Sequence, residues 1–363
     1  MAGASRGAAA RPARVGPRGR GTHRTRPGSL KRHFCSFCDP PRRMRKKMRM
    51  RIMSDGRVMV FAPAPQLTVT IEQHHDEPEL HVHPGGQGIW QTRMITSLGA
   101  QVTLCTAAGG EVGRVLAPLM AELPGVTMRL VGREHGTGWY VHDRRSGSRQ
   151  EIAERPGVPL SRHELDELYN LTLAEGLRAG IAILSGPAHP SVIKPEVYGR
   201  LAADLRSNGC RVIADLCGRY LEEVLAAGLN VVKISHEELI KDGLAADGST
   251  RELMNALMKI NTDGAEAVLV SRADEGALAL IDDEIYAVTL PRLTAAEHRG
   301  AGDSMTAGVA ATLASGGTLT DAVRTGAAAG ALNVTRHGLG TGHVDAVRVL
   351  TERVRLTPIK KAS

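Results

Sequence analysis

Residues 299–308 read Arg-Gly-Ala-Gly-Asp-Ser-Met-Thr-Ala-Gly and are the most informative segment of the chain. Two glycines flank an alanine, an aspartate follows directly, and a small-residue helix pattern continues to Ser315. A glycine turn that opens a helix leaves backbone N–H groups pointing outward, and the helix dipole adds positive potential there, so such a turn attracts an anion. Asp303 beside it can accept the proton of an attacking hydroxyl, so the stretch predicts phosphoryl transfer to an alcohol. The same residues also fit an ordinary helix start with Asp303 as its cap.

Outward from this turn, the body alternates short apolar strands with helical segments. Strands that alternate with helices of ten or more residues indicate βαβ units and a mostly parallel sheet, whose ligands bind beyond the carboxyl ends of the strands. Polar-flanked strands within 67–83 are expected to form an edge or lid element. The strands expected in the main series are 58–62, 101–107, 126–130, 181–185, 211–215, 231–234 and 267–271, followed by a hairpin at 277–281 and 284–289.

The charge of the chain is concentrated at its start. Residues 1–53 hold 16 of the 46 Lys and Arg but a single acidic residue, so the remainder has 30 basic and 37 acidic residues. The first 53 residues are rich in Arg, Gly, Pro and Ala without apolar periodicity, which predicts a disordered basic tail. Three interpretations of the tail remain open: a non-native upstream extension, a basic arm that contacts anionic partners, or a transit peptide. Any interaction with nucleic acid would depend on this tail alone.

The five cysteines stand at positions 35, 38, 105, 210 and 217. An odd count without a secretory segment favours reduced thiols and a cytoplasmic protein. Cys35 and Cys38 have metal-ligand spacing, but no second such pair completes a zinc site. No run of about 18 apolar residues predicts a membrane span.

A second glycine motif, His-Pro-Gly-Gly-Gln-Gly at 83–88, lies about 215 residues before the Gly-Ala-Gly-Asp turn. Taken together, the two motifs resemble those of the PfkB/ribokinase family of carbohydrate kinases, and most closely the 1-phosphofructokinase and tagatose-6-phosphate kinase group. The resemblance covers residues 58–342, and its companion stretches are 97–103, 109–113, 151–152, 156–157, 185–186 and 233–238.

This resemblance implies a ribokinase-like three-layer α/β/α sandwich with a mostly parallel central sheet and a small β-sheet lid. The kinase domain would span 54–345, with the lid formed by about 67–83 and 138–153. Residues 346–363 would form a C-terminal helix and tail. The resemblance also implies that the lid mediates a homodimer.

The resemblance further implies ATP and Mg²⁺ as cofactors and a role for each matching position. Asp303 would be the catalytic base, the amides of Gly300, Ala301 and Gly302 would hold the phosphoryl charge, and Glu238 would help to organise Mg²⁺ through water. The residues implied near the nucleotide are Ser271, Gly276, Gly338, Gly340 and Gly342. The residues at the acceptor positions are Gln66, Gly85, Gly86, Gln87, Trp90 and Arg149.

The acceptor half departs from the family pattern. Gln66 stands where the family has a sugar-binding Asp, Gln87 where it has Lys, and Trp90 where it has Asn. Trp90 can stack on a ring or fill the core, and Arg149 can meet a phosphate or face solvent. Asp215, at the end of its strand, fits a structural cap better than a site residue.

The sequence therefore predicts an ATP-dependent kinase of a sugar or sugar phosphate, similar to phosphofructokinases. Two alternatives remain open: a ligand-binding or regulatory protein on the same fold with little turnover, and a kinase of an unphosphorylated sugar or a nucleoside. A Rossmann dehydrogenase is excluded because no Gly-x-Gly-x-x-Gly follows the first strand.

Overall fold

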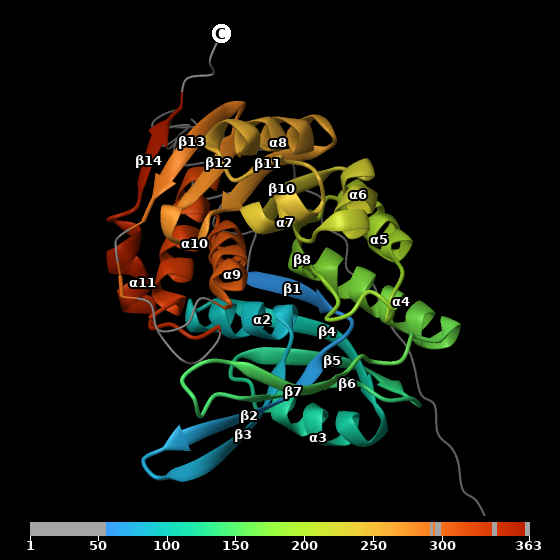
Figure 1. The fold of residues 1–363 in the computed structure, drawn as a ribbon. Coiled ribbons are helices and arrows are strands. Elements are labelled where there is room, and N and C mark those ends of the chain that lie inside the picture. Colours follow the sequence, from blue (N-terminus) through green and yellow to red (C-terminus); the bar gives the residue numbers. More distant parts are fainter. Residues whose placement is uncertain (1–55, 291–292, 295–298, 336–339, 360–363) are drawn as a thin grey trace, which may run out of the picture. The chain divides into compact units, whose positions relative to one another are not determined.

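The computed structural model describes residues 56–290, 293–294, 299–335 and 340–359. Within them, the larger sheet has ten strands (Figure 1). The seven strands from β5 to β11 are parallel, and the last three extend the sheet in antiparallel pairs. Across the sheet the order is β5 (Val126–Arg133), β4 (Gln101–Gly109), β1 (Arg57–Ala62), β8 (Ile181–Ser185), β9 (Arg211–Asp215), β10 (Leu229–Ser235), β11 (Ala265–Ser271), β12 (Ala277–Ile281), β13 (Glu284–Thr289) and β14 (Arg355–Pro358).

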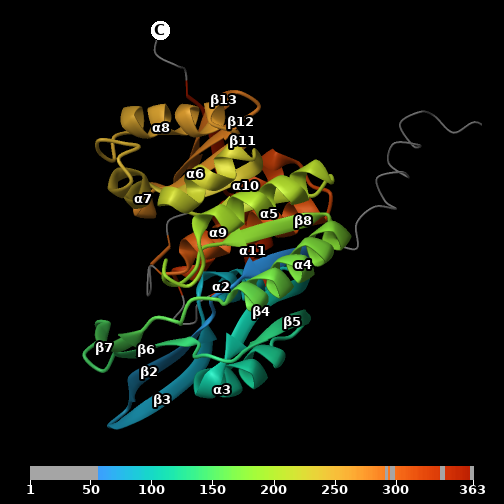
Figure 2. The ribbon, with the colours of Figure 1, turned by 90° about the vertical axis from the view of Figure 1, so that its right-hand side faces the viewer.

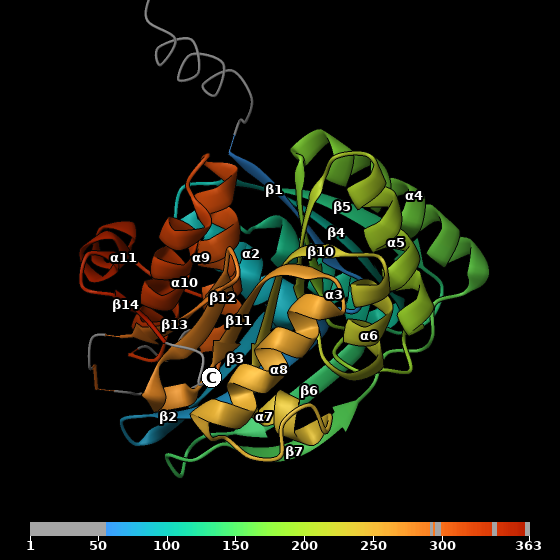
Figure 3. The ribbon, with the colours of Figure 1, turned by 90° about the horizontal axis from the view of Figure 1, so that it is seen from above.

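The central strands are apolar on both faces, so helices must cover both sides of the sheet. In β1, Val58 and Val60 point into one core while Met59 and Phe61 point into the other. The helices of the first core are α2 (Gln87–Ser97), α3 (Gly110–Ala121), α9 (Ala301–Ala314), α10 (Leu319–Asn333) and α11 (Val344–Thr351). Those of the second core are α4 (Arg162–Ala179), α5 (Pro195–Ser207), α6 (Gly218–Ala226) and α8 (Thr250–Thr262). Figure 3 shows α9, α10 and α11 on one side of the molecule and α4, α5 and α6 on the other.

A separate four-stranded sheet lies beside α3 (Figure 2). Its order is β3 (Glu77–Gly85), β2 (Gln66–His74), β6 (Gly138–Asp143) and β7 (Gln150–Arg155). The β2–β6 pair is parallel and the two outer pairs are antiparallel. Cross-strand partners point to the same face, so this sheet has an outer face that carries Val69 and Val82 and an inner face that carries Thr68 and His83. We call it the lid sheet.

The structure confirms the α/β fold with a large, mostly parallel sheet and a smaller separate one. Residues 346–363 were predicted to form only a helix and a tail. In the structure, β14 follows α11, pairs with β13 and forms the edge strand of the large sheet. The predicted basic tail of residues 1–53 lies outside the described residues. Cys105, Cys210 and Cys217 are free thiols. Each helix of the described part is too short or too polar to cross a bilayer.

Candidate active site

The glycine turn lies at the start of α9. Gly300 is the N-cap with φ of 73°, a left-handed conformation that a side chain would strain, and the helix begins at Ala301. The Ser304 amide donates to the Gly300 carbonyl at 2.9 Å, so the amides before it form the open first turn. Asp303 stands in this turn. The predicted anion site and the predicted base are therefore brought together at one helix terminus.

Two buried, oppositely charged residues lie next to this turn. Asp215 is the last residue of β9 and Lys233 lies on the neighbouring strand β10, with Nζ 3.3 Å from Asp215 Oδ1. Their side chains are only 2% and 7% exposed. A Cβ on Gly302 would overlap Lys233 Nζ, so the ammonium lies directly against the turn. The buried pair thus places a positive charge beside the predicted anion site.

Asp303 has a strongly perturbed pKa. Burial and the negative charges of Asp215 and Glu238 raise it to about 8, against the opposing effects of Lys233 and a hydrogen bond from Gln87. Burial alone would lower the pKa of Lys233, but Asp215, Glu238 and Asp303 hold it above its ordinary value. A carboxyl group with a pKa near the working pH is well matched to general base catalysis.

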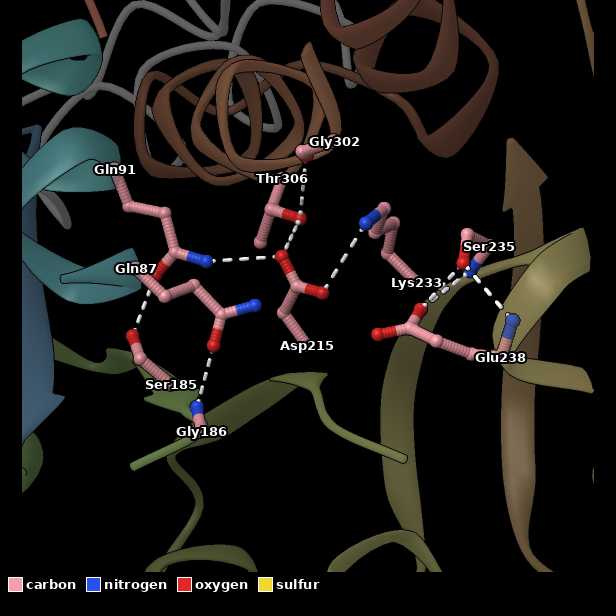
Figure 4. Close-up of polar contacts among 10 residues, drawn as sticks. All are labelled: Gln87, Gln91, Ser185, Gly186, Asp215, Lys233, Ser235, Glu238, Gly302 and Thr306. Carbon is pink, nitrogen blue, oxygen red and sulfur yellow. Dashed lines mark hydrogen bonds and ion pairs between the residues drawn. The ribbon is translucent and has the colours of Figure 1, made fainter. Parts of the chain in front are cut away.

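Glu238 is the third residue of the short helix α7 (His236–Lys241) and forms a capping box with Ser235. One oxygen, Oε2, accepts from the Ser235 amide and from its hydroxyl, each at 2.8 Å (Figure 4). The capping box fixes the Glu238 carboxylate at the carboxyl end of β10. Its negative charge raises the pKa of both Lys233 and Asp303. Glu238 therefore has a structural role in addition to its predicted one.

Two glutamines of α2 reach into the same centre. Gln87 accepts a hydrogen bond from the Gly186 amide at 2.5 Å, and Gln91 donates to Asp215 Oδ2 at 2.9 Å. Thr306, one turn into α9, also lies 2.7 Å from Asp215 Oδ2. Figure 4 shows these side chains converging from α2, α9 and the ends of the strands.

The remaining predicted acceptor residues gather where β2, β3 and α2 meet. Gln66 opens β2 directly opposite Gly85 of β3, and Gly86 caps α2 with φ of 106°. The Gln66 amide nitrogen lies 3.4 Å from Glu154 Oε1. A small, partly open pocket lies beside Gln66, and its lining includes Ala64, Pro65, Thr137, Gly138, Gly157 and His189.

Trp90 is half-buried, and its indole Nε1 is a buried donor that has no partner within the described residues. Gly340 has φ of 64° and packs so closely on the Trp90 backbone that a Cβ would overlap it. Gly342 contacts Met94, one turn further along α2. These two predicted nucleotide residues therefore lie against α2. Gly338 lies outside the described residues.

Ser271 and Gly276 frame the turn between β11 and β12. Ser271 ends β11 opposite Ser235, and its carbonyl lies 3.3 Å from His236 Nδ1. Gly276 has φ of 85°, and a Cβ there would overlap the Val288 carbonyl. Ser271 thus adjoins α7 and the rest of the centre, whereas the glycine is required by the turn itself.

Arg149 lies on the inner face of the lid sheet. Its guanidinium stacks 4.6 Å from the Tyr140 ring centre, and Nε lies 3.3 Å from the Tyr140 hydroxyl. Burial and nearby cations, Arg149 among them, lower the pKa of both His83 and His142 to about 4. This face therefore carries a concentration of positive charge.

Reasoning from sequence missed three members of the centre. It favoured a cap for Asp215, assigned no role to Lys233, and did not single out Gln91. A polar residue at the carboxyl end of a parallel strand was the available signal for Asp215. Lys233 is surrounded by apolar sequence, where a buried polar residue requires partners; that was the signal for it. Gln91 is followed by Thr92 and Arg93, so no local signal marks it.

Comparison with known proteins identifies the family of the chain. The family model described as pfkB family carbohydrate kinase matches residues 51–346. The chain is 31% identical over 291 residues to ATP-dependent 6-phosphofructokinase isozyme 2 of Escherichia coli (strain K12), covering 77% of this chain and 92% of that protein. It is 25% identical to a tagatose-6-phosphate kinase of Staphylococcus epidermidis, covering 72% and 84% of the two chains.

Solved structures agree with the sequence relatives. The crystal structure of phosphofructokinase-2 from Escherichia coli in complex with potassium aligns with a TM-score of 0.71 at 27% identity, covering 82% of this chain and 98% of that one. Arabidopsis thaliana ribokinase, solved with ribose and ATP, aligns with a TM-score of 0.65 at 20% identity and shares the fold; it covers 83% of this chain and 99% of its own. The predicted family is confirmed, and the chain belongs to the pfkB family of carbohydrate kinases.

Proposed function

We propose that this carbohydrate kinase transfers the γ-phosphoryl group of ATP to a hydroxyl of a sugar phosphate, with Asp303 as the catalytic base. The observation that carries the proposal is the position of Asp303, in the open first turn of α9 with a pKa raised to about 8. The named relatives act on sugar phosphates, as their names state. Residues 54–345 would form the kinase domain.

In this mechanism the acceptor oxygen attacks the γ-phosphorus as Asp303 takes the hydroxyl proton. The new oxygen–phosphorus bond forms while the bridge to the β-phosphate breaks, and ADP leaves. The amides of Gly300, Ala301 and Gly302 stabilise the charge of the transferring group, because a helix N-terminus presents donors and positive potential. Lys233 adds a fixed positive charge against Gly302.

The donor set of the centre fits Mg²⁺. Glu238 uses Oε2 in its capping box, and these bonds do not involve Oε1. Mg²⁺ prefers oxygen ligands, keeps several waters and binds through one or two carboxylates plus substrate phosphates. Bound Mg²⁺ would neutralise phosphate charge, with Glu238 oriented toward its water shell.

An ADP-release assay tests the proposal. The full chain is assayed with ATP and Mg²⁺ against hexoses, pentoses, ketohexose phosphates and nucleosides. Turnover that depends on a sugar phosphate supports the proposal, and turnover with an unphosphorylated acceptor alone contradicts its substrate class. ATP binding without any acceptor-dependent turnover would instead indicate a binding or regulatory protein.

The inner face of the lid sheet supports a phosphorylated acceptor. His83 lies on β3 two residues before Gly85, and His142 on β6 binds Thr70 through its Nε2 at 3.2 Å. Arg149 influences both histidines, and Arg299, next to the Gly300 turn, influences His142. Positive charge therefore extends from the lid sheet to the start of α9. A guanidinium on this face can bind a phosphate through two hydrogen bonds.

Replacing Arg149 with Ala is expected to raise KM for the sugar phosphate about tenfold and to change kcat little, because a hydrogen-bonded charge contact made in ground and transition states is lost. Steady-state kinetics measure both constants. Arg145→Ala is the control, since Arg145 pairs with the exposed turn residue Asp143. An unchanged KM would remove Arg149 from acceptor binding.

The outer face of the lid sheet supports a homodimer. Leu80 is 63% exposed and Val82 40%. Leu80 and Val82 pair with Ile71 and Val69 across the β2–β3 hairpin, which makes a continuous apolar stripe. Apolar surface of this kind is stabilised when a second copy covers it.

The cytoplasmic location inferred from the cysteines also remains a prediction.

Leu80→Asp is expected to shift the protein from dimer to monomer, because a charge at the centre of an apolar interface must be desolvated. Light scattering after size exclusion measures the mass. Leu177→Asp is the matched control: Leu177 is 40% exposed on α4, away from the lid sheet. A wild-type monomer, or a Leu80→Asp dimer, would contradict the lid interface.

A further inference from the structure

Helix α2 presents Gln87 and Gln91 on one face. They are four residues apart, so their side chains lie one above the other. Gln91 bonds Ser185 and Gln87 bonds Gly186, two consecutive residues at the carboxyl end of β8. Figure 4 shows the two amides side by side between that strand end and the charged centre.

Gln91 connects β8 to Asp215. Its Oε1 accepts from Ser185 Oγ at 2.5 Å, and its Nε2 donates to Asp215 Oδ2 at 2.9 Å. The side chain is completely buried. Both ends of the amide are therefore satisfied, and the Asp215 carboxylate is held against β8 on one side and paired with Lys233 on the other.

Gln87 makes the equivalent connection for Asp303. Its Oε1 accepts from the Gly186 amide at 2.5 Å, and the same side chain, as a donor, lowers the pKa of the Asp303 carboxyl group. A Cβ on Gly186 would approach Gln87 Oε1 to 3.1 Å, so the glycine leaves room for this contact. The amide thus joins the end of β8 to the catalytic base.

An amide suits both connections, because it accepts through its oxygen and donates through its nitrogen, whereas lysine only donates and a carboxylate only accepts. For Gln91, the oxygen faces the Ser185 hydroxyl and the nitrogen faces the Asp215 carboxylate. For Gln87, the oxygen faces the Gly186 amide, and its donor lowers the pKa of Asp303. Glutamine therefore fits both positions.

We propose that Gln87 and Gln91 are paired positioning residues that fix the Asp303 base and Asp215 to the end of β8. This inference rests on the proposed function. It adds which residues orient the Asp303 carboxylate. Gln87 holds the reacting carboxylate directly. Gln91 acts one step away, because Asp215 in turn holds Lys233 beside Gly302.

Charged groups face Asp303 from three other elements: Asp215 on β9, Lys233 on β10 and Glu238 on α7. Asp215 and Glu238 raise the pKa of Asp303, while Lys233 and the neutral donor Gln87 lower it. Removing the Gln87 donor therefore raises this pKa, so the acid limb of the pH–rate profile moves to higher pH. A purely structural role would not move that limb.

The test compares Gln87→Met and Gln87→Glu with the wild-type chain. We expect kcat to fall about tenfold in Gln87→Met, as for loss of one hydrogen bond to a charged group. KM for ATP and for the acceptor should change less than about twofold, and the acid limb should move upward. Gln87→Glu keeps the acceptor for Gly186 but loses the donor for Asp303, and should lose at least as much activity.

Gln101→Met is the matched control, because Gln101 is exposed at the amino end of β4. Gln91→Met tests the second connection, and thermal denaturation confirms that it is folded before its kcat is compared; the expected fall is again about tenfold. An unchanged kcat and acid limb in Gln87→Met would overturn the proposal. A rise in acceptor KM alone would also overturn it and make Gln87 a substrate contact. Absence of wild-type turnover would instead refute the proposed function, which separates the two failures.

Discussion

Replacing Asp303 with Asn should lower kcat by about 10²–10⁴-fold, the range expected when a general base is lost. The substitution is nearly isosteric, so α9 and its amides should remain in place. KM for ATP should change little, because those amides and not the carboxylate are proposed to hold the phosphates. The ADP-release assay measures both constants, and a variant that retained more than a tenth of the activity would contradict the assignment of the base.

The same variant should be more stable than the wild-type protein at alkaline pH. Asp303 has a folded pKa of about 8, above its ordinary value of 3.8. Its favourable contribution is therefore complete below about pH 4 and is lost as the pH rises through 8. Above that pH the wild-type fold carries a desolvated carboxylate beside Asp215 and Glu238, whereas Asn carries none.

Thermal denaturation of both proteins between pH 5 and 9 measures this effect. We expect the Tm of Asp303→Asn to exceed the wild-type value by roughly 2–4 °C near pH 9, and the difference to shrink toward pH 5. A difference that did not change with pH would mean that Asp303 ionises as an ordinary carboxylate. Opposite changes in activity and stability are expected where a catalytic group is held in an unfavourable environment.

The parts of the site that could be predicted from the sequence are those that depend on residues close together in the chain. The Gly-Ala-Gly-Asp turn needs a left-handed residue directly before a helix, and Gly300 adopts that conformation. The alternation of strands and helices predicted the large sheet for the same reason: each unit is specified by its own period.

The parts that sequence did not predict depend on contacts between distant segments. Asp215 is recognised as a site residue only when β9, β10, α2 and α9 bring Lys233, Gln91 and Thr306 around it. Pairs separated by 18 to 124 residues leave no local pattern. Strand β14 was missed because four residues, Arg-Leu-Thr-Pro, carry too short a pattern and become a strand only by pairing with β13.

Lys233→Met should be the most destabilising single substitution in the centre. Methionine matches the volume of the lysine stem but removes the positive charge that Asp215, Glu238 and Asp303 share. Breaking a buried ion pair from one side leaves an uncompensated charge and costs about 3–5 kcal/mol. The pKa of Lys233 is raised in the fold, so this contribution is complete at neutral pH and is lost only as the pH rises through the folded value.

Urea unfolding at pH 7.5 measures the loss, and Lys259→Met is the matched control. Lys259 forms an exposed pair with Asp263 at 2.9 Å, so its removal should cost less than about 1 kcal/mol. The double variant Lys233→Met with Asp215→Asn should recover most of the stability, because it also removes the unpaired charge. A single variant as stable as the control would show that Asp215 is neutral in the fold. If the double variant recovers stability but not turnover, the buried pair serves catalysis. Two neutral residues would then replace the ion pair in the fold, but not its charge beside the phosphoryl group.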